Sequence, residues 1–579
     1  MNDAMDMMRS IKDRSDETEF YTPLPDGYRL GSTRYVAVFG TVMSGLGKGI
    51  FSSSLAKLLK DKGLRVSPIK LEGYLNIDAG TLNPFRHGEV FVLDDGTECD
   101  MDLGTYERML DQDLTRLNFA TSGQIYSTVL EKERAGAYLG RDVQMIPHVT
   151  GEVKFRLRTL AVQTRADVVF VEVGGTVGDI ENAFYIEALR ELSYEEGEGA
   201  VMCVALTYVL SPPALGEQKS KAAQLGIKRL MEFGIHPHLI ACRCQDPVNE
   251  KVRQKISVYT NVPMPRVFSM HDLPSIYLLP QQMREAGLDS EVVSLLKLGG
   301  KVNSAADARA AIRWERFTAG IERPTRQVTV GITGKYTSVR DSYASILKAL
   351  EHAGAANEAK VNVKWIDTTD VTADNVAAAL ADVDGVIVPG GFGVRGTTGK
   401  IECVRHAREK RLPYLGICLG LQMAVIEYAR NVCGLTDADS TEISPDCPTP
   451  VIGILPEQKA IEGLGGNMRL GGQDVEIRPG TLAAELFGGA RTIRQRFRHR
   501  FEVDPRYVQE LEQAVLVFSG KHPVHPIMQI LELPRSVHPY FIAAQFHPEL
   551  TSRPLRPQPM FAGLVAAMLA GKEAGAGRR

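Results

Sequence analysis

The sequence predicts an α/β protein made of two doubly wound domains. Apolar segments typical of buried parallel strands alternate with helical segments along most of the 579 residues. A glycine-rich loop at residues 40–49 lies between the first expected strand and a helix, as in P-loop-like parallel-sheet domains. The alternation loosens around residues 296–326 and then resumes with a second series of strands. A chain of this length favours two or more domains, each with its own core.

The expected elements follow this alternation through both halves. In the first half, we expect strands at residues 35–39, 66–70, 167–173, 201–208 and 238–241, and a helix over 50–62. In the second half, we expect strands at 328–332, 363–366, 385–389 and 540–546, with another ending before Cys418. The predicted organisation is a flexible extension (1–33), a first domain (34–300), a linker (301–326), a second domain (327–570) and a disordered tail (571–579).

The composition is that of an ordinary globular protein, with 44% hydrophobic and 24% charged residues. A net charge of -3 argues against a general nucleic-acid binder. No apolar run reaches the length of a membrane span, and residues 1–33 lack the apolar core of a signal peptide. The eight cysteines include no C-x-x-C pair, so we expect a reducing, cytoplasmic setting.

Cys418 lies between an apolar strand and a helix, with Gly416 and Gly420 on either side. This pattern is typical of a nucleophile elbow, in which a sharp turn exposes the thiol and the helix N-terminus favours its thiolate. Most cysteines are instead small buried hydrophobes, so the elbow alone leaves both readings open. His547 and Glu549 favour the nucleophile, because an activated cysteine needs a base and the base needs a carboxylate to orient it.

The loop at residues 40–49 has the composition of a phosphate-binding loop. Its backbone N–H groups and the following helix N-terminus can hold phosphates, with Lys48 reaching the terminal ones. The spacing departs from the usual pattern, and Gly49 stands where Ser or Thr would bind magnesium. The alternative is a glycine-rich structural turn.

Without that hydroxyl, magnesium needs other oxygen ligands. Asp100, Asp102 and Glu172 are candidates, and Glu172 ends an apolar strand, where open α/β sheets bind ligands. Lys70 also ends a strand and can contact the same phosphates. Each acid taken alone would more often be a solvated surface charge.

Two further loops carry polar residues suited to a nucleotide. In the glycine-rich loop 174–181, Asp179 and Glu181 can accept hydrogen bonds from ribose hydroxyls. Lys219 and Lys221 suit a second polyphosphate, although their segment also reads as an ordinary solvated helix start.

With these motifs in place, the chain resembles the CTP synthase family from about residue 34 to residue 563. The resemblance rests on long strings rather than on one motif. They are SGLGKGI (44–50), HGEVFV (87–92), DLGTYER (102–108), EVGGTVGDIE (172–181), PGGFGVRG (389–396), LGICLG (415–420) and QFHPE (545–549).

The resemblance implies that residues 34–300 form an amidoligase, or synthetase, domain that phosphorylates the O4 atom of UTP with ATP before ammonia displaces the phosphate. The positions matching ATP contacts are Gly45, Leu46, Gly47, Lys48, Gly49, Ile50, Lys70, Asp102, His271, Asp272 and Leu273, and the positions matching Mg²⁺ ligands are Asp102 and Glu172. The positions matching UTP or CTP contacts are Ser44 (which also falls in the ATP set), Asp179, Ile180, Glu181, Lys219, Lys221, Gln224 and Lys255.

The resemblance also implies a C-terminal class I glutaminase in which Cys418 is the nucleophile, His547 the base and Glu549 the orienting acid. The matching glutamine-binding positions are Gly391, Phe392, Leu419, Gln422, Glu442 and Arg500. The family further implies internal passage of ammonia, activation by GTP, and homo-oligomers (dimers or tetramers, and filaments).

The glutaminase strings are complete, whereas the synthetase strings depart from the family near the expected acceptor pocket. The family's Gly-Gly-Val-Val-Ser-Ser is GTVMSG at 40–45, its Lys-Leu-Asp-Pro-Tyr is KLEGY at 70–74, and its Pro-Thr-Gln-His-Ser is AAQLG at 222–226. Three hypotheses remain open on the sequence: a CTP synthase, an amidoligase acting on another nucleotide or pyrimidine-like acceptor, and a non-catalytic member that acts through assembly.

Overall fold

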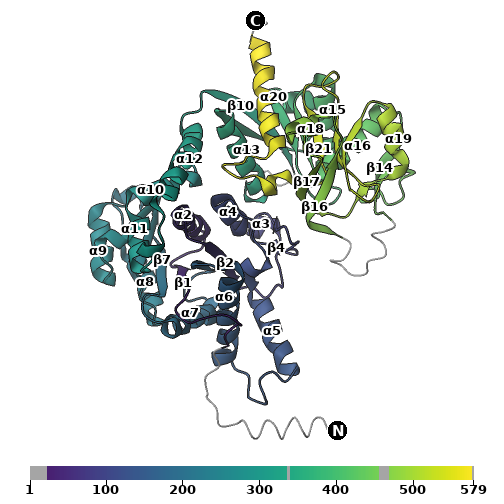
Figure 1. The fold of residues 1–579 in the computed structure, drawn as a ribbon. Coiled ribbons are helices and arrows are strands. Elements are labelled where there is room, and N and C mark those ends of the chain that lie inside the picture. The colour runs from purple at the N-terminus through teal and green to yellow at the C-terminus, as the bar shows by residue number, and fades with distance from the viewer. Residues whose placement is uncertain (1–22, 335–339, 456–467, 577–579) are drawn as a thin grey trace, which may run out of the picture. The chain divides into compact units, whose positions relative to one another are not determined.

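A computed structural model of the protein describes residues 23–334, 340–455 and 468–576. Most of the predicted N-terminal extension (1–22) and the last three residues of the predicted tail (577–579) lie outside these described residues. The chain divides into two compact units: Met1–Thr81 with Thr105–Ile312, and Leu82–Gly104 with Arg313–Arg579. Figure 1 labels many of the elements of both.

The first unit is built on a parallel sheet, as predicted. Its described strands have the order β5-β2-β6-β1-β7-β8-β9, and every neighbouring pair is parallel. The central strands are almost entirely buried apolar residues, which is typical of a sheet covered on both faces. The strands are β1 (Arg34–Gly40), β2 (Val66–Glu72), β5 (Phe119–Thr121), β6 (Val168–Val173), β7 (Val201–Tyr208), β8 (Leu239–Cys244) and β9 (Val267–His271).

Helices lie on both faces of this sheet, with α2 and α10 above the strands and α6 and α7 below them in Figure 1. The doubly wound arrangement is therefore confirmed for this unit. The helices are α2 (Lys48–Asp61), α4 (Met101–Leu110), α5 (Ser122–Arg134), α6 (Thr150–Thr164), α7 (Ala183–Glu196), α8 (Lys221–Glu232), α9 (Glu250–Thr260), α10 (Leu279–Glu285) and α11 (Leu288–Leu295), of which α4 begins within Leu82–Gly104.

The second unit contains a mixed sheet of order β11-β10-β12-β13-β21-β20-β19-β16-β17 among its described residues. The first five strands are parallel and match the predicted series, whereas the last four add an antiparallel extension that the sequence pattern did not indicate. The strands are β10 (Arg326–Gly334), β11 (Ala359–Asp367), β12 (Gly385–Val388), β13 (Tyr414–Ile417), β16 (Arg469–Ile477), β17 (Thr492–His499), β19 (Val517–Lys521), β20 (Met528–Glu532) and β21 (Phe541–Ala544).

The helices and small strands of the second unit complete its layers. A small sheet joins β14 (Ala438–Ser440), β15 (Thr449–Gly453) and β18 (Glu502–Val503). The main helices are α13 (Ala344–Ala356), α14 (Val376–Ala379), α15 (Thr397–Lys410), α16 (Leu419–Asn431), α18 (Leu482–Leu486), α19 (Pro505–Gln513) and α20 (Pro559–Ala576), and α20 extends into the segment predicted as a tail.

The boundaries between the two units differ from the predicted domain boundaries in two segments. The predicted linker contains helix α12 (Ser304–Glu322), and the boundary between the units falls inside it. Residues 82–104, which we call the arm, pack with the second unit although their sequence lies within the range 34–300. The arm contains α3 (Pro84–His87) and the hairpin of β3 (Phe91–Val92) and β4 (Glu98–Cys99).

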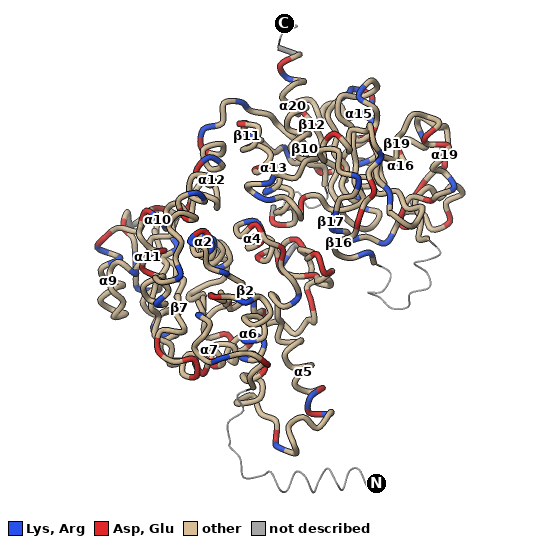
Figure 2. Tube along the Cα trace, in the orientation of Figure 1, with Lys and Arg blue, Asp and Glu red and all other residues tan. Residues whose placement is uncertain are grey.

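Charged residues of both signs are interspersed along each unit (Figure 2). No helix among the described residues has the length and apolar character needed to cross a membrane. The eight cysteines all lie in described segments and form no disulfide there.

Candidate active site

Cys418 occupies a sharp turn between β13 and α16, as the elbow pattern predicted. Its backbone has φ 52° and ψ -103°, a region that non-glycine residues rarely adopt. The amide of Cys418 donates to the carbonyl of Ala544 on β21 at 2.7 Å, which fixes the turn at the end of the parallel sheet. The strained residue is thus the cysteine itself, and its thiol lies at the N-terminus of a helix.

The two flanking glycines are needed because their surroundings leave no room for a side chain, and not because their backbone has a positive φ. Neither Gly416 nor Gly420 has φ in the left-handed region. A Cβ atom at Gly420 would lie 2.0 Å from the carbonyl oxygen of Val388, and one at Gly416 would lie 2.8 Å from Cβ of Ala543. Glycine is therefore required so that α16 and the neighbouring strands can approach the elbow.

His547 and Glu549 form a dyad beside the elbow. Nδ1 of His547 lies 2.7 Å from Oε1 of Glu549. A Cβ atom at Gly390 would lie 3.7 Å from Nε2 of His547 and 3.5 Å from Cβ of Cys418, so both side chains border the same small space. Nδ1 of His547 is occupied by Glu549, so Nε2 is the ring nitrogen that faces the Cys418 thiol.

The electrostatics of the dyad favour a protonated imidazole. Burial by itself lowers the pKa of His547, but the charges of Glu549 and of the Cys418 thiolate outweigh burial and raise this pKa to about 10. An imidazolium beside the cysteine is the arrangement that suits a cysteine nucleophile.

The loop after β12 carries the predicted oxyanion and glutamine-binding positions. The amide of Gly393 donates to Oε1 of Glu442 at 2.8 Å. A Cβ atom at Gly391 would lie 3.8 Å from Cδ2 of Leu419, the residue after the nucleophile. Phe392 is 42% exposed, so its ring lies at the surface of the loop. The structure therefore brings Gly391, Leu419 and Glu442 close to the elbow.

The turn between β17 and β18 lies on another side of the nucleophile. Sγ of Cys418 is 3.7 Å from the carbonyl oxygen of Arg498, and Nε2 of Gln422 donates to the carbonyl of Phe501 at 3.0 Å. Arg500 lies between these two carbonyls in the sequence. Gln422 thus belongs to the same cluster as the cysteine, and Arg500 lies in the turn whose carbonyls contact both.

Sequence reasoning missed Gln545, whose Nε2 donates toward Sγ of Cys418 at 3.7 Å and whose Oε1 lies 3.4 Å from Nε2 of Gln422. The signal was present, because Gln545 begins the same short string as His547 and Glu549.

The first unit gathers its predicted residues at the carboxyl edge of its parallel sheet. The loop after β1 has positive φ at Gly45 and Gly47, and α2 begins at Lys48. Nζ of Lys48 donates to the carbonyl of Gly175 at 2.9 Å, which joins the two glycine-rich loops. Positive-φ glycines before a helix N-terminus are consistent with a phosphate loop formed by Ser44, Gly45, Leu46, Gly47, Lys48, Gly49 and Ile50.

Lys70 and Glu172 form a buried ion pair at the ends of adjacent strands. Nζ of Lys70 lies 2.6 Å from Oε1 of Glu172 and 3.4 Å from Oε1 of Glu72. The hydroxyl of Tyr106 donates to Oε2 of Glu172 at 3.1 Å. Neither Glu72 nor Tyr106 was among the predicted site residues.

The predicted magnesium ligands fit the ion's chemistry in part. Mg²⁺ is usually held by one or two carboxylates together with substrate phosphates, and Asp102 and Glu172 would supply two. No group of three or more His, Cys, Asp or Glu side chains suited to a metal occurs among the described residues. Asp102, in the first turn of α4, belongs with the arm and Glu172 with the other unit, so their joint site stays a prediction.

The predicted acceptor residues lie in loops and helices that follow β6 and β7. Oδ2 of Asp179 accepts from the amide of Thr176 at 2.7 Å, and Ile180 is 89% exposed. Gln224 is buried on α8 and donates to Oγ of Ser220 at 3.0 Å. The remaining members are Glu181, Lys219 (paired with Glu217), Lys221 at the start of α8 and the exposed Lys255 on α9.

The predicted adenine-binding segment, His271 to Leu273, lies at the end of β9, on the same edge of the sheet. Nδ1 of His271 is 3.0 Å from Nε2 of Gln282, and Asp272 pairs with Arg243 at 2.5 Å. The Asp272 amide also donates to the carbonyl of Gln245 at 3.2 Å, so side-chain and backbone contacts together fix the segment.

Two of the departures from the family pattern pack against each other. A Cβ atom at Gly226 would lie 2.9 Å from both Cβ and Oγ1 of Thr41 and 2.8 Å from Cγ2 of Val42. The family strings given above have glycine at the position of Thr41 and serine at the position of Gly226. A side chain at position 226 would therefore collide with Thr41 and Val42, which is a structural reason for the glycine there.

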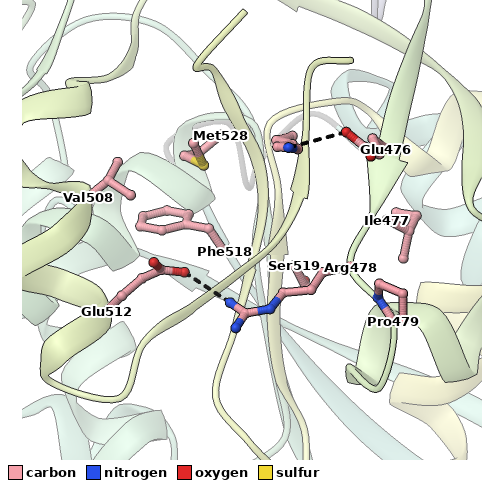
Figure 3. A pocket seen from close by; sticks show the side chains of 10 residues that line it. Glu476, Ile477, Arg478, Pro479, Val508, Glu512, Phe518, Ser519 and Met528 are labelled. Atoms are coloured by element: carbon pink, nitrogen blue, oxygen red, sulfur yellow. Dashed lines mark hydrogen bonds and ion pairs between the residues drawn. The ribbon is translucent and has the colours of Figure 1, made fainter. Parts of the chain in front are cut away.

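A separate pocket of about 380 Å³ lies in the second unit (Figure 3). Its lining comes from the ends of β16, β19 and β20 and from α19, and the ion pair of Arg478 with Glu512 spans it. It contains none of the predicted site residues and therefore lies outside the candidate active site.

Comparison with known proteins gives a consistent assignment for both halves. Residues 34–298 match the family model described as CTP synthase N-terminus, and residues 338–567 match the model described as glutamine amidotransferase class-I.

Relatives of known name cover nearly the whole chain. CTP synthase of Pyrococcus furiosus is 48% identical over 536 residues, which cover 92% of this chain and 98% of the relative. CTP synthase of Thermus thermophilus is 46% identical over 545 residues, which cover 93% and 98%. A solved structure of the glutaminase domain of Trypanosoma brucei CTPS with bound acivicin is 33% identical, covers 42% of this chain and 94% of that one, and aligns with a TM-score of 0.40.

Proposed function

The chain belongs to the CTP synthase family, and from that premise we propose how its residues carry out the family's reaction. The protein is a glutamine-hydrolysing ligase that uses ATP to aminate UTP to CTP. The comparisons favour UTP as the acceptor and give no support to a different one. The observation that supports the residue assignment best is the convergence of Cys418 and His547 on the space beside Gly390.

In the glutaminase reaction, the Cys418 thiolate attacks the side-chain amide carbon of glutamine. The amide N–H of Gly391 stabilises the resulting oxyanion, because it lies on the loop beside the nucleophile. His547 gives its proton to the departing nitrogen, so that the C–N bond breaks and ammonia is released. The acyl group remains on Cys418 as a thioester. Water activated by His547 then hydrolyses the thioester to glutamate, while Glu549 keeps the imidazole oriented throughout.

The remaining glutaminase residues hold the substrate. Arg500 suits the α-carboxylate of glutamine, since a guanidinium binds a carboxylate through two parallel hydrogen bonds. Glu442 suits the α-amino group, and its carboxylate is already held by the Gly393 amide. Phe392, Leu419 and Gln422 complete the set proposed to surround the substrate.

In the synthetase reaction, the loop of residues 44–50 holds the phosphates of ATP, with Lys48 and Lys70 neutralising their charge. Asp102 and Glu172 would hold Mg²⁺, which supplies charge stabilisation to the transferring phosphoryl group when it is bound. The segment His271 to Leu273 contacts adenine. ATP phosphorylates the UTP O4 atom, and ammonia then displaces phosphate at C4.

The acceptor nucleotide is proposed to bind through two sets of side chains. Lys219, Lys221 and Lys255 contact the triphosphate, and Asp179 and Glu181 contact ribose hydroxyls. Ser44, Ile180 and Gln224 complete the pocket, in which CTP would bind as well.

Further family properties are inferred for this chain from its membership. We expect ammonia to pass internally, because free ammonia is largely protonated near neutral pH and then cannot attack. We also infer activation by GTP, a homo-oligomer (dimer or tetramer, and filaments), and a cytoplasmic setting consistent with cysteines that form no disulfide.

The test uses two reciprocal variants of the purified full-length chain. Cys418→Ala should abolish CTP synthesis from glutamine and retain synthesis from an ammonium salt, because only the nucleophile is lost. Lys48→Ala should abolish synthesis from both nitrogen sources. Loss of ammonium-dependent synthesis in Cys418→Ala, or its retention in Lys48→Ala, would refute the division of labour between the two halves.

A further inference from the structure

The arm is held against the second unit by alternate arginines of β17. Arg494, Arg496 and Arg498 are spaced two residues apart on this strand. Side chains at that spacing lie on the same face of a strand. Each of the three contacts the arm, so β17 presents a cationic row to a segment that belongs in sequence to the synthetase half.

The outer contact joins Arg494 to Asp94. Nε and Nη2 of Arg494 lie 3.0 and 2.9 Å from Oδ2 of Asp94, in a forked geometry. The backbone is joined there too, because the amide of Gly472 donates to the Asp94 carbonyl at 2.8 Å. The side chains remain 53% and 36% exposed, however, and exposed ion pairs contribute little.

The middle contact buries Arg496, which is 1% exposed. Its Nη1 donates to the carbonyl of Val92 at 3.2 Å, and its guanidinium lies over the Phe91 ring at 5.6 Å. The arm's β3 strand is therefore fixed to the centre of β17.

The inner contact reaches the candidate active site. Nε of Arg498 donates to Oε1 of Glu98 at 2.7 Å, and the two side chains are only 19% and 12% exposed. The same guanidinium lies over the ring of Phe392 at 5.3 Å. Phe392 directly follows Gly391, the proposed oxyanion residue. Glu98 is therefore connected to the proposed glutamine site through Arg498 and Phe392.

Strand β17 also supports the catalytic residues through its backbone. The carbonyl of Arg496 accepts from the His547 amide at 2.8 Å, and the carbonyl of Arg498 lies 3.7 Å from Sγ of Cys418. One face of β17 thus contacts the arm through side chains, while its carbonyls contact the nucleophile and its base.

We propose that Glu98 is a positioning residue for the glutaminase reaction. Its carboxylate holds the Arg498 guanidinium over Phe392, which keeps the loop carrying Gly391 in place for glutamine. A residue within the range matched by the synthetase model therefore serves the glutaminase site. This inference rests on the proposed role of Phe392 in binding glutamine.

The experiment compares Glu98→Gln with the matched control Asp94→Asn, on the same arm and opposite the same strand. Glu98→Gln should raise KM for glutamine about tenfold, with a smaller effect on kcat, because a partly buried charge-assisted hydrogen bond is lost. Asp94→Asn should change KM by about twofold or less, since its ion pair is exposed. Ammonium-dependent CTP synthesis should stay unchanged in both variants.

A double-mutant cycle isolates the pair. Arg498→Gln should raise KM for glutamine, and adding Glu98→Gln to it should produce no further rise, because both changes remove the same contact. Glu98→Asp should recover part of the loss. Equal KM effects of Glu98→Gln and Asp94→Asn, additive effects in the cycle, or an equal loss of ammonium-dependent synthesis would overturn the proposal. Wild-type protein that hydrolyses no glutamine would instead refute the proposed function itself.

Discussion

Cys418 combines backbone strain with a prepared electrostatic environment. A non-glycine residue at φ 52° and ψ -103° costs roughly 1–3 kcal/mol, so the surrounding structure must impose the conformation. The hydrogen bond to Ala544 and the tight packing at Gly420 impose it. At this turn, close packing and chemical reactivity therefore depend on the same few residues.

The pH dependence of glutamine hydrolysis should report the His547–Glu549 contact. With the pKa of His547 raised to about 10, the imidazolium persists at neutral pH, and the alkaline limb of kcat/KM should lie near that pH. Glu549→Gln removes the largest cause that raises this pKa, so the limb should move to lower pH. The measurement is glutamate release across the pH range. An unshifted limb in the variant would mean that Glu549 does not control the titration.

The same shift affects stability with a definite sign. Because the pKa of folded His547 lies above the ordinary value of 6.5, protonation of this residue favours the folded state. That contribution is complete below about pH 6.5 and disappears as the pH rises through about 10.

At the scale of elements, the phosphate loop and helix α8 approach each other closely at Thr41 and Gly226. Gly226→Ser alone would place its Cβ 2.9 Å from Thr41, and overpacking of this kind costs about 1–3 kcal/mol. We therefore expect a lower melting temperature and weaker UTP binding for Gly226→Ser. Thermal unfolding and the KM for UTP measure the two effects.

The control is Thr41→Gly/Gly226→Ser, which restores the family pattern at both positions. It should recover part of the loss, because Thr41→Gly removes the contacts with Thr41 while the contact with Cγ2 of Val42 remains. Equal or greater loss in the double variant would show that the two substitutions are not coupled.

The elements that could be predicted from the sequence are those that depend on the residues within the element itself. The apolar strands β1, β6 and β7 and the glycine-rich turns could be read directly, because burial on both faces leaves a continuous apolar run. Strand β17 could not be read in this way. Its charged residues look solvated, and the arm that binds them lies about four hundred residues earlier in the chain.

The residues of the candidate site show the same difference between local patterns and tertiary contacts. Cys418 lies in a short string with the elbow pattern, and His547 and Glu549 lie together in a second short string, so each string could be recognised in the sequence. Arg498 and Tyr106 were missed because their relevance depends on tertiary contacts, with Phe392 in one case and Glu172 in the other. Pattern reasoning had no means of finding such partners.

At the scale of the whole molecule, the arm means that sequence ranges and compact units do not coincide. Residues 82–104 lie inside the range matched by the synthetase model but pack with the glutaminase unit. The arm continues directly into α4, which carries the proposed magnesium ligand Asp102. A single chain segment thus links residues proposed for the two half-reactions.

The most direct test of the central claim, that this chain transfers the amide nitrogen of glutamine to UTP, is an isotope measurement. The purified protein would be given ATP, Mg²⁺, UTP and glutamine labelled with ¹⁵N in the amide, together with an excess of unlabelled ammonium near neutral pH. We expect CTP with ¹⁵N as its exocyclic nitrogen, resolved by chromatography and mass spectrometry. The absence of CTP, or CTP containing only the unlabelled nitrogen, would contradict the assignment.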